Sequence, residues 1–149
     1  MTIKSLRNAL LLVAGVLLLT ACASRPATVA EAPAARLEGP VVDQRWNLLL
    51  VGTNERLSLP QPAWFRIDPD GRVSGSNGCH TLRGRAQLGD NQRIAFSELA
   101  STRQACPQAE DVQRVTAMLE TAYRYLIDHD RLVFFGPDQR VLGGWRRAD

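Results

Sequence analysis

Side chains that carry out metal or acid–base chemistry are scarce in this sequence. The chain of 149 residues has two histidines, His80 and His129, and three cysteines. A zinc site takes three or four ligands at recognisable spacings, and neither histidine belongs to such a pattern. The Gly-x-Ser-x-Gly segment that marks a hydrolase nucleophile is also missing. The sequence therefore predicts no metal site, no cofactor and no catalytic residue.

Long apolar runs are missing as well, except at the amino terminus. Residues 9–19 form an apolar run of 11 residues that follows the basic Lys4 and Arg7. A transmembrane helix needs roughly 20 apolar residues, so this run is too short to span a bilayer. A basic start, a short apolar run and small residues after it are typical of a secretory signal peptide. We therefore predict that residues 1–21 are a signal peptide.

The signal peptide ends in Leu19-Thr20-Ala21-Cys22, which resembles the lipobox of bacterial lipoproteins. The resemblance implies that the Cys22 thiol receives a diacylglyceryl group, that the peptide is cut before it, and that the new amine is acylated. Several acyl chains together anchor a protein stably. Since Ala23 and not Asp follows the cysteine, the sorting rule of such lipoproteins implies the periplasmic face of the outer membrane. The alternative is an ordinary secreted protein with a chance cysteine.

Positive charge is not in excess once the signal peptide is removed. The loss of Lys4 and Arg7 leaves 16 basic and 15 acidic side chains, a net charge of +1. Nucleic-acid-binding domains carry a basic excess, so we expect no nucleic acid as a partner. Residues 22–38 are rich in Ala and Pro and contain no aromatic residue, which predicts a flexible tether. The folded domain is expected at residues 39–149, as a monomer.

Short stretches of alternating polarity predict that most of this domain is built of strands. Turn residues at 68–71 (Asp-Pro-Asp-Gly) and at Asn77-Gly78 separate these stretches and favour tight hairpins. One predicted strand starts at Val73. The other predicted strands cover residues 41–51, 64–67, 79–88, 93–96, 131–135 and 140–145.

One helix is predicted, over about residues 107–128, because apolar residues recur there at spacings of three and four. Several hairpins and one late helix indicate an α+β domain: a small curled antiparallel β-sheet or open barrel of about six to eight strands with one main helix. The residues of the helix stripe are Val112, Val115, Leu119, Ala122 and Leu126. The aromatic residues expected in the core are Trp46, Trp64, Phe65, Phe96, Phe134, Phe135 and Trp145.

Four segments of the chain resemble the META domain, a family of HslJ-like proteins and many small bacterial lipoproteins. They are Trp46-Asn47-Leu48, GRVSGSNGCHTLRG at 71–84, IAFSELASTRQACP at 94–107 and RLVFFGPDQRVL at 131–142. The resemblance implies a small sheet-and-helix domain without established catalytic activity and loosely associated with envelope stress. At His80 the family usually has asparagine. The family motif falls on Trp46, Gly75, Asn77, Gly78, Cys79, His80, Ser101, Thr102 and Cys106.

Two cysteines, Cys79 and Cys106, are left once Cys22 carries lipid. An even pair in an oxidising compartment favours a structural disulfide. Free buried thiols and a reactive pair are the open alternatives. A nucleophilic Cys79 with His80 as its base is disfavoured, because adjacent residues on a strand point to opposite faces.

The leading hypothesis is a lipid-anchored accessory protein without enzymatic activity, which binds an envelope protein partner or stabilises the envelope. The alternative is a carrier of a lipid or small apolar ligand, whose aromatic residues would line a pocket at the barrel mouth. An enzyme would need convergent polar groups that this sequence does not show. Ser101 and Thr102 are expected to form local hydrogen bonds near the start of the helix and not to bind a ligand.

Overall fold

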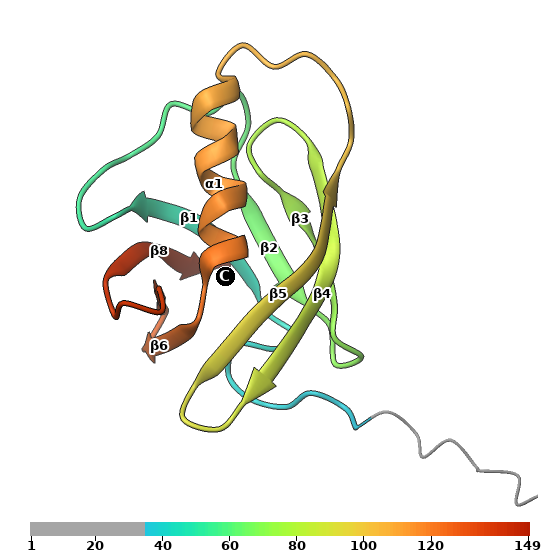
Figure 1. The fold of residues 1–149 in the computed structure, drawn as a ribbon, viewed down its shortest axis with the longest axis vertical. Coiled ribbons are helices and arrows are strands. Elements are labelled where there is room, and N and C mark those ends of the chain that lie inside the picture. Colours follow the sequence, from blue (N-terminus) through green and yellow to red (C-terminus); the bar gives the residue numbers. More distant parts are fainter. Residues whose placement is uncertain (1–34) are drawn as a thin grey trace, which may run out of the picture. The chain divides into compact units, whose positions relative to one another are not determined.

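The protein is described by a computed structural model that covers residues 35–149 (Figure 1). The predicted signal peptide, Cys22 and most of the predicted tether lie outside these residues. The described chain forms one helix, α1 (Ala109–Thr121), and eight strands. The strands are β1 (Arg45–Val51), β2 (Trp64–Ile67), β3 (Arg72–Ser76), β4 (Thr81–Gly89), β5 (Arg93–Ser101), β6 (Arg124–Asp128), β7 (Arg131–Phe135) and β8 (Val141–Arg147).

The strands follow one another around a closed antiparallel ring. Each strand pairs with the next one along the chain, and β8 pairs with β1. The predicted fold class, a curled antiparallel sheet with one helix, is confirmed. Two of the ladders are short, because β1 and β2 pair at only three residue positions and β5 and β6 at only one. These two seams matter below, since they leave room beside the strands.

Aromatic side chains fill the inside of the ring. Successive residues of a strand point to opposite faces, and the inward residues of β1, β2, β7 and β8 include large rings. The Phe65 ring lies 4.8 Å from the Trp145 ring and 5.7 Å from the rings of Phe96 and Phe134, measured between centroids. The fully buried aromatic residues are Trp46, Phe65, Phe134 and Trp145, and Phe96 is 8% exposed.

Two of the seven aromatic residues expected in the core are only partly buried. Trp64 and Phe135 each stand next to an inward aromatic residue on the same strand, so the alternation of the strand turns them outward. Four of the five rings inside, those of Phe65, Phe96, Phe134 and Trp145, pack against one another in edge-to-face and stacked pairs, which add about 0.5–1.5 kcal/mol per pair to area burial.

The helix covers one opening of the ring (Figure 1). It packs against β5, β1 and β8, and its buried residues are Val112, Val115, Met118 and Leu119. Within residues 35–149, no helix has the length and apolar character that crossing a bilayer requires.

The prediction that the helix extends to about residue 128 was wrong. It ends at Thr121, and Ala122 already has the extended angles φ −57° and ψ 129°. Residues after it form β6, in which Tyr125 and Ile127 pack against the core while Leu126 is 51% exposed. Leu126 fitted the helix stripe only because it follows Ala122 by four positions, whereas the residues around it alternate as a strand does.

Other strand bounds also differ from those predicted. The first strand begins at Arg45 and not at 41, because Asp43 takes a left-handed turn conformation with φ 60°. β5 continues to Ser101 and not only to 96. A bulge in its pairing with β4, where Glu98 has φ 54°, lets it continue past the irregular position.

Candidate functional site

A buried asparagine, Asn77, organises the turn between β3 and β4. Its side-chain Oδ1 accepts hydrogen bonds from the backbone N–H groups of Cys79 (3.3 Å) and His80 (2.9 Å). Its Nδ2 donates to Oγ1 of Thr116 on α1 at 3.1 Å. Asn77 is 2% exposed, so these partners replace water for a side chain that must be hydrogen-bonded when buried. One amide group therefore shapes the turn and ties it to the helix.

The same turn is fastened to the connection between β5 and α1. A disulfide joins Cys79 to Cys106. Nε2 of Gln104 donates to the backbone carbonyl of Cys79 at 3.1 Å, and Nε2 of His80 donates to the carbonyl of Gln104 at 2.8 Å. One disulfide and two hydrogen bonds thus hold this connection against the turn.

The turn also supports the loop between β1 and β2. The backbone N–H of Gln61 donates to the carbonyl of Gly78 at 2.9 Å. Gly78 has φ +100°, and a Cβ on it would lie 2.8 Å from Cδ1 of Leu59, so only glycine fits there. Gly75 is required for a different reason, since a Cβ there would lie 2.2 Å from the Trp64 carbonyl on β2.

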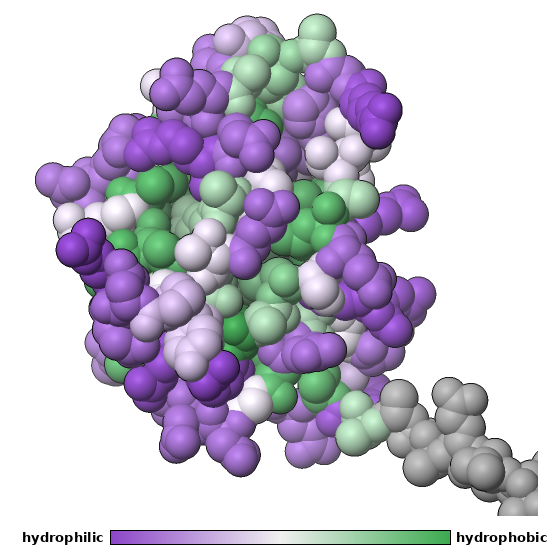
Figure 2. Space-filling model, viewed as in Figure 1, coloured by the Kyte–Doolittle hydropathy of each residue, from purple (hydrophilic) through white to green (hydrophobic). Residues whose placement is uncertain are grey.

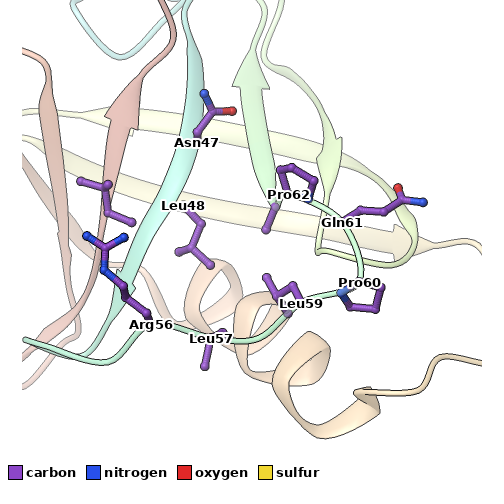
Figure 3. A pocket seen from close by; sticks show the side chains of 10 residues that line it. Asn47, Leu48, Arg56, Leu57, Leu59, Pro60, Gln61 and Pro62 are labelled. Atoms are coloured by element: carbon purple, nitrogen blue, oxygen red, sulfur yellow. The ribbon is translucent and has the colours of Figure 1, made fainter.

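A cleft of about 360 Å³ opens between β1 and this loop (Figure 3). Figure 3 shows Leu48 on β1 and Leu59 on the loop facing each other, with α1 behind them. Both leucines are partly buried against the core, as is Leu57. The cleft therefore has an apolar floor, while Arg56 and Gln61 are exposed polar residues in its lining.

The loop is attached to the helix by an ion pair. Arg114 of α1 donates to both carboxylate oxygens of Glu55, at 2.8 Å and 2.5 Å. This hydrogen bonding, together with the positive charge of Arg114, holds the pKa of the Glu55 carboxyl below its usual value. The loop is thus held at Glu55 by the helix and at Gln61 by the turn, and the cleft lies between these points.

A second cleft, of about 310 Å³, lies on the other side of Gln61, whose side chain contributes to both. Its lining includes Trp64, His80, three hydroxyl side chains and Arg83. None of the residues that line either cleft is acidic. On the face shown in Figure 2, apolar side chains reach the surface in small patches among polar ones.

Unpaired arginines surround the two clefts. Arg45 lies over the Trp64 ring, with its guanidinium carbon 4.1 Å from the ring centroid. Within residues 35–149, Arg45, Arg56 and Arg83 form no ion pair with a carboxylate. The same part of the chain holds no group of three or more His, Cys, Asp or Glu residues that could bind a metal ion. The first cleft therefore has an apolar floor, and arginines near both clefts add positive charge.

The model of the META domain family matches residues 39–149. The chain belongs to the META domain family. A comparison with curated proteins found no match.

Solved structures share the fold of this META domain. The crystal structure of a DUF4847 family protein from Bacteroides vulgatus is 14% identical, with a TM-score of 0.56 over 74% of this chain and 97% of that one. An NMR structure of a protein from Burkholderia xenovorans is 18% identical, with a TM-score of 0.58 over 78% of this chain and 97% of the other. A further NMR structure is 23% identical, with a TM-score of 0.54, and covers 71% and 90% of the two chains. At these identities the similarity concerns the fold alone.

The structure brings most of the predicted META motif together. The residues that meet at the turn between β3 and β4 are Gly75, Asn77, Gly78, Cys79, His80 and Cys106. Trp46 lies inside the barrel, where its Nε1 donates to the Val41 carbonyl at 3.1 Å. The expectation that Cys79 and His80 stand on a strand was wrong, because both belong to the turn before β4.

Ser101 and Thr102 were expected near the start of the helix, but they do not lie there. Ser101 ends β5, and Thr102 donates its backbone N–H to the Thr81 carbonyl at 3.2 Å. The helix begins at Ala109, after Gln108, which forms no side-chain capping bond. The segment between β5 and α1 separates the two residues from the helix, so the part of the expectation that placed them near the helix start was wrong.

The cleft residues were missed by sequence reasoning, although the chain carries a signal for them. Leu57 and Leu59 alternate with polar residues and are followed by Pro60 and Pro62, which is typical of an extended edge segment. Thr116 is a polar residue directly after the buried Val115 of the helix stripe. Its Oγ1 lines neither cleft but accepts the hydrogen bond from Nδ2 of Asn77.

Replacing Asn77 with Ala should lower the free energy of unfolding by about 2–3 kcal/mol, because it removes three hydrogen bonds and leaves buried groups unsatisfied. The matched change Thr116→Val removes only one of these partners and should cost about 1 kcal/mol. Urea unfolding of both variants gives the comparison. An Asn77→Ala cost no greater than that of Thr116→Val would contradict the central role of the amide.

Loss of the Cys79–Cys106 bridge should lower the free energy of unfolding by about 3.5 kcal/mol in the chain-entropy model, because the bridge closes a loop 27 positions long. Urea unfolding of the protein with Cys79→Ser and Cys106→Ser, beside the wild type, measures this loss. Mass spectrometry after alkylation without reduction is the control. If both cysteines are alkylated in protein from an oxidising compartment, the bridge does not form.

Proposed function

We propose that this META domain is a lipid-anchored, non-catalytic accessory protein of the outer membrane, which binds a segment of an envelope protein in its two clefts. The family supports an accessory role, since neither the META nor the DUF4847 family is known for catalysis. The observation that carries the proposal is the pair of clefts around Gln61, with an apolar floor and arginines that lack carboxylate partners among the described residues.

The packing of the barrel favours binding at its outer surface. A carrier of apolar ligands would need space between the inward aromatic side chains. Here the rings of Phe65, Phe134 and Trp145 lie within 6.2 Å of one another, between centroids, and fill that space. We therefore place the partner on the outside of the ring.

The chemistry of the clefts defines the partner. Leu48, Leu57 and Leu59 suit apolar side chains of an extended segment, which would be removed from water on binding. Arg56 and Arg83 suit carboxylates on the same segment, because complementary charge orients a partner and speeds its encounter.

The lipid anchor would keep the domain at the membrane where such partners are found. The proposal for Cys22 rests on the lipobox, and residues 22–38 would act as a flexible tether. The association with envelope stress follows from the family resemblance and belongs to the same proposal.

Changing Cys22 to Ala should release the protein from the outer membrane or mislocalise it, because the change removes the thiol that carries the lipid. Membrane fractionation of cells measures the shift, and mass spectrometry of the wild-type amino terminus should show the acyl groups. The matched control is Cys79→Ala with Cys106→Ala, which should leave the fraction unchanged. A Cys22→Ala protein still found in the outer membrane would sink the anchoring proposal.

A photo-reactive amino acid in place of Gln61 should capture the partner in cells, because this side chain lies between the two clefts. Charge reversal by Arg56→Glu with Arg83→Glu should reduce capture about tenfold or more, since two attractive contacts become repulsive. Arg131→Glu, an exposed arginine on β7, is the control and should leave capture unchanged.

The captured region of the partner should contain acidic and apolar residues, and reversing its acidic charges should restore binding to the arginine-reversed domain. Equal capture by the wild type and the reversed domain, with both folded, would show that the clefts are not the binding site.

A further inference from the structure

Arginines face arginines across several strand pairs of this barrel. Like charges directly opposite each other on neighbouring strands destabilise a sheet. Such an arrangement persists when a counter-charge lies nearby. The four facing pairs are Arg45–Arg66, Arg72–Arg85, Arg93–Arg124 and Arg131–Arg146.

Three of these pairs have a carboxylate of the chain beside them. Arg66 forms ion pairs with Asp43 and Asp68, and Arg72 does so with Asp70. Arg146 pairs with Asp130. Over the described range 35–149, Arg93 and Arg124 form no ion pair. The Arg93–Arg124 pair is therefore the one whose two charges are left without a carboxylate.

Neutral groups hold the two side chains in place. The guanidinium carbon of Arg93 lies 3.6 Å from the centroid of the Tyr123 ring, and Nη1 of Arg124 donates to Oε1 of Gln139 at 3.5 Å. These contacts orient the guanidinium groups but do not cancel their charge. A pocket of about 500 Å³ opens at this point, lined by Asp90, Asn91, Arg93, Tyr123, Arg124 and Gln139.

The pocket stands at the weakest seam of the barrel. β5 and β6 pair only at Arg93 and Arg124, so the two residues stand opposite each other where few backbone bonds hold the strands together. A group with one or two negative charges placed between them would reduce the repulsion and bridge the strands. The fork of N–H donors on each guanidinium matches the oxygens of such a group.

We propose that Arg93 and Arg124 form a binding site for a phosphate group, separate from the two clefts. Asp90 also lines the pocket but forms no ion pair with either arginine, and its negative charge weakens the binding of an anion there. The phosphate belongs either to a soluble phosphate compound or to the headgroup of an anionic phospholipid. The lipid source agrees with the position of the first described residues. The backbone N–H of Leu37 donates to the Pro69 carbonyl in the β2–β3 turn, at the barrel end that also holds the β4–β5 turn (Figure 1).

Calorimetric titration of the full-length protein in non-ionic detergent with pyrophosphate tests the site. Binding should persist at constant ionic strength set with sodium chloride and should weaken about tenfold or more in Arg124→Gln, because a charged hydrogen-bonding partner is lost. Arg131→Gln, from a facing pair that has its own carboxylate, is the matched control and should bind as the wild type does. Asp90→Asn should bind several times more tightly.

A second titration separates the two sources of phosphate. Dihexanoyl phosphatidylglycerol is compared with inorganic phosphate, and dihexanoyl phosphatidylcholine serves as the zwitterionic control. Tighter binding of the phosphatidylglycerol supports the headgroup, and tighter binding of inorganic phosphate supports a soluble compound. Equal affinities of the wild type and Arg124→Gln for every phosphate, with cooperative unfolding of both, would overturn the proposal. These titrations do not depend on the proposed function: if the two clefts turned out to bind no protein partner, the expected phosphate binding would be the same.

Discussion

The side-chain amide of Asn77 is the contact on which the arrangement of the site depends. A buried amide must find partners for its donor and acceptor atoms, and Asn77 finds them in its own turn and on the helix. Once the turn is fixed, Cys79 is placed for its bond to Cys106 and Gly78 for its contact with Leu59. The most specific segment of the META motif therefore specifies geometry and not chemistry.

The first cleft and the arginine pocket both lie where strand pairing ends. The ladder between β1 and β2 ends after three residue pairs, and the first cleft opens beside it as the chain leaves β1 for the loop. The ladder between β5 and β6 has one pair, and the arginine pocket opens there.

Local patterns predicted the fold class, whereas the details that depend on distant neighbours could not be predicted. Alternation and turn residues located seven of the eight strands, and the stripe from Val112 to Ala122 located the helix. β6 was missed because Leu126 continued the helical spacing, and only its pairing with Val133 on β7 reveals a strand. The disulfide partners could be named by counting cysteines. The clefts could not be predicted from the sequence, because Leu48 and Leu59 meet only after the turn at Asn77 has positioned the loop.

The distribution of counter-charges separates the arginine pocket from the rest of the surface. Turns and loop residues supply the carboxylates of the other facing pairs, as Asp70 does before β3 and Asp130 before β7. Asp90 has the corresponding place before β5, yet the turn uses its backbone carbonyl to accept the N–H of Arg93 at 3.2 Å, and its carboxylate forms no ion pair in the structure. Because the Asp90 carboxylate pairs with neither residue, Arg93 and Arg124 stand opposite each other without a counter-charge from the described chain. An anion from outside the chain then has the role that carboxylates of the chain have at the other three pairs.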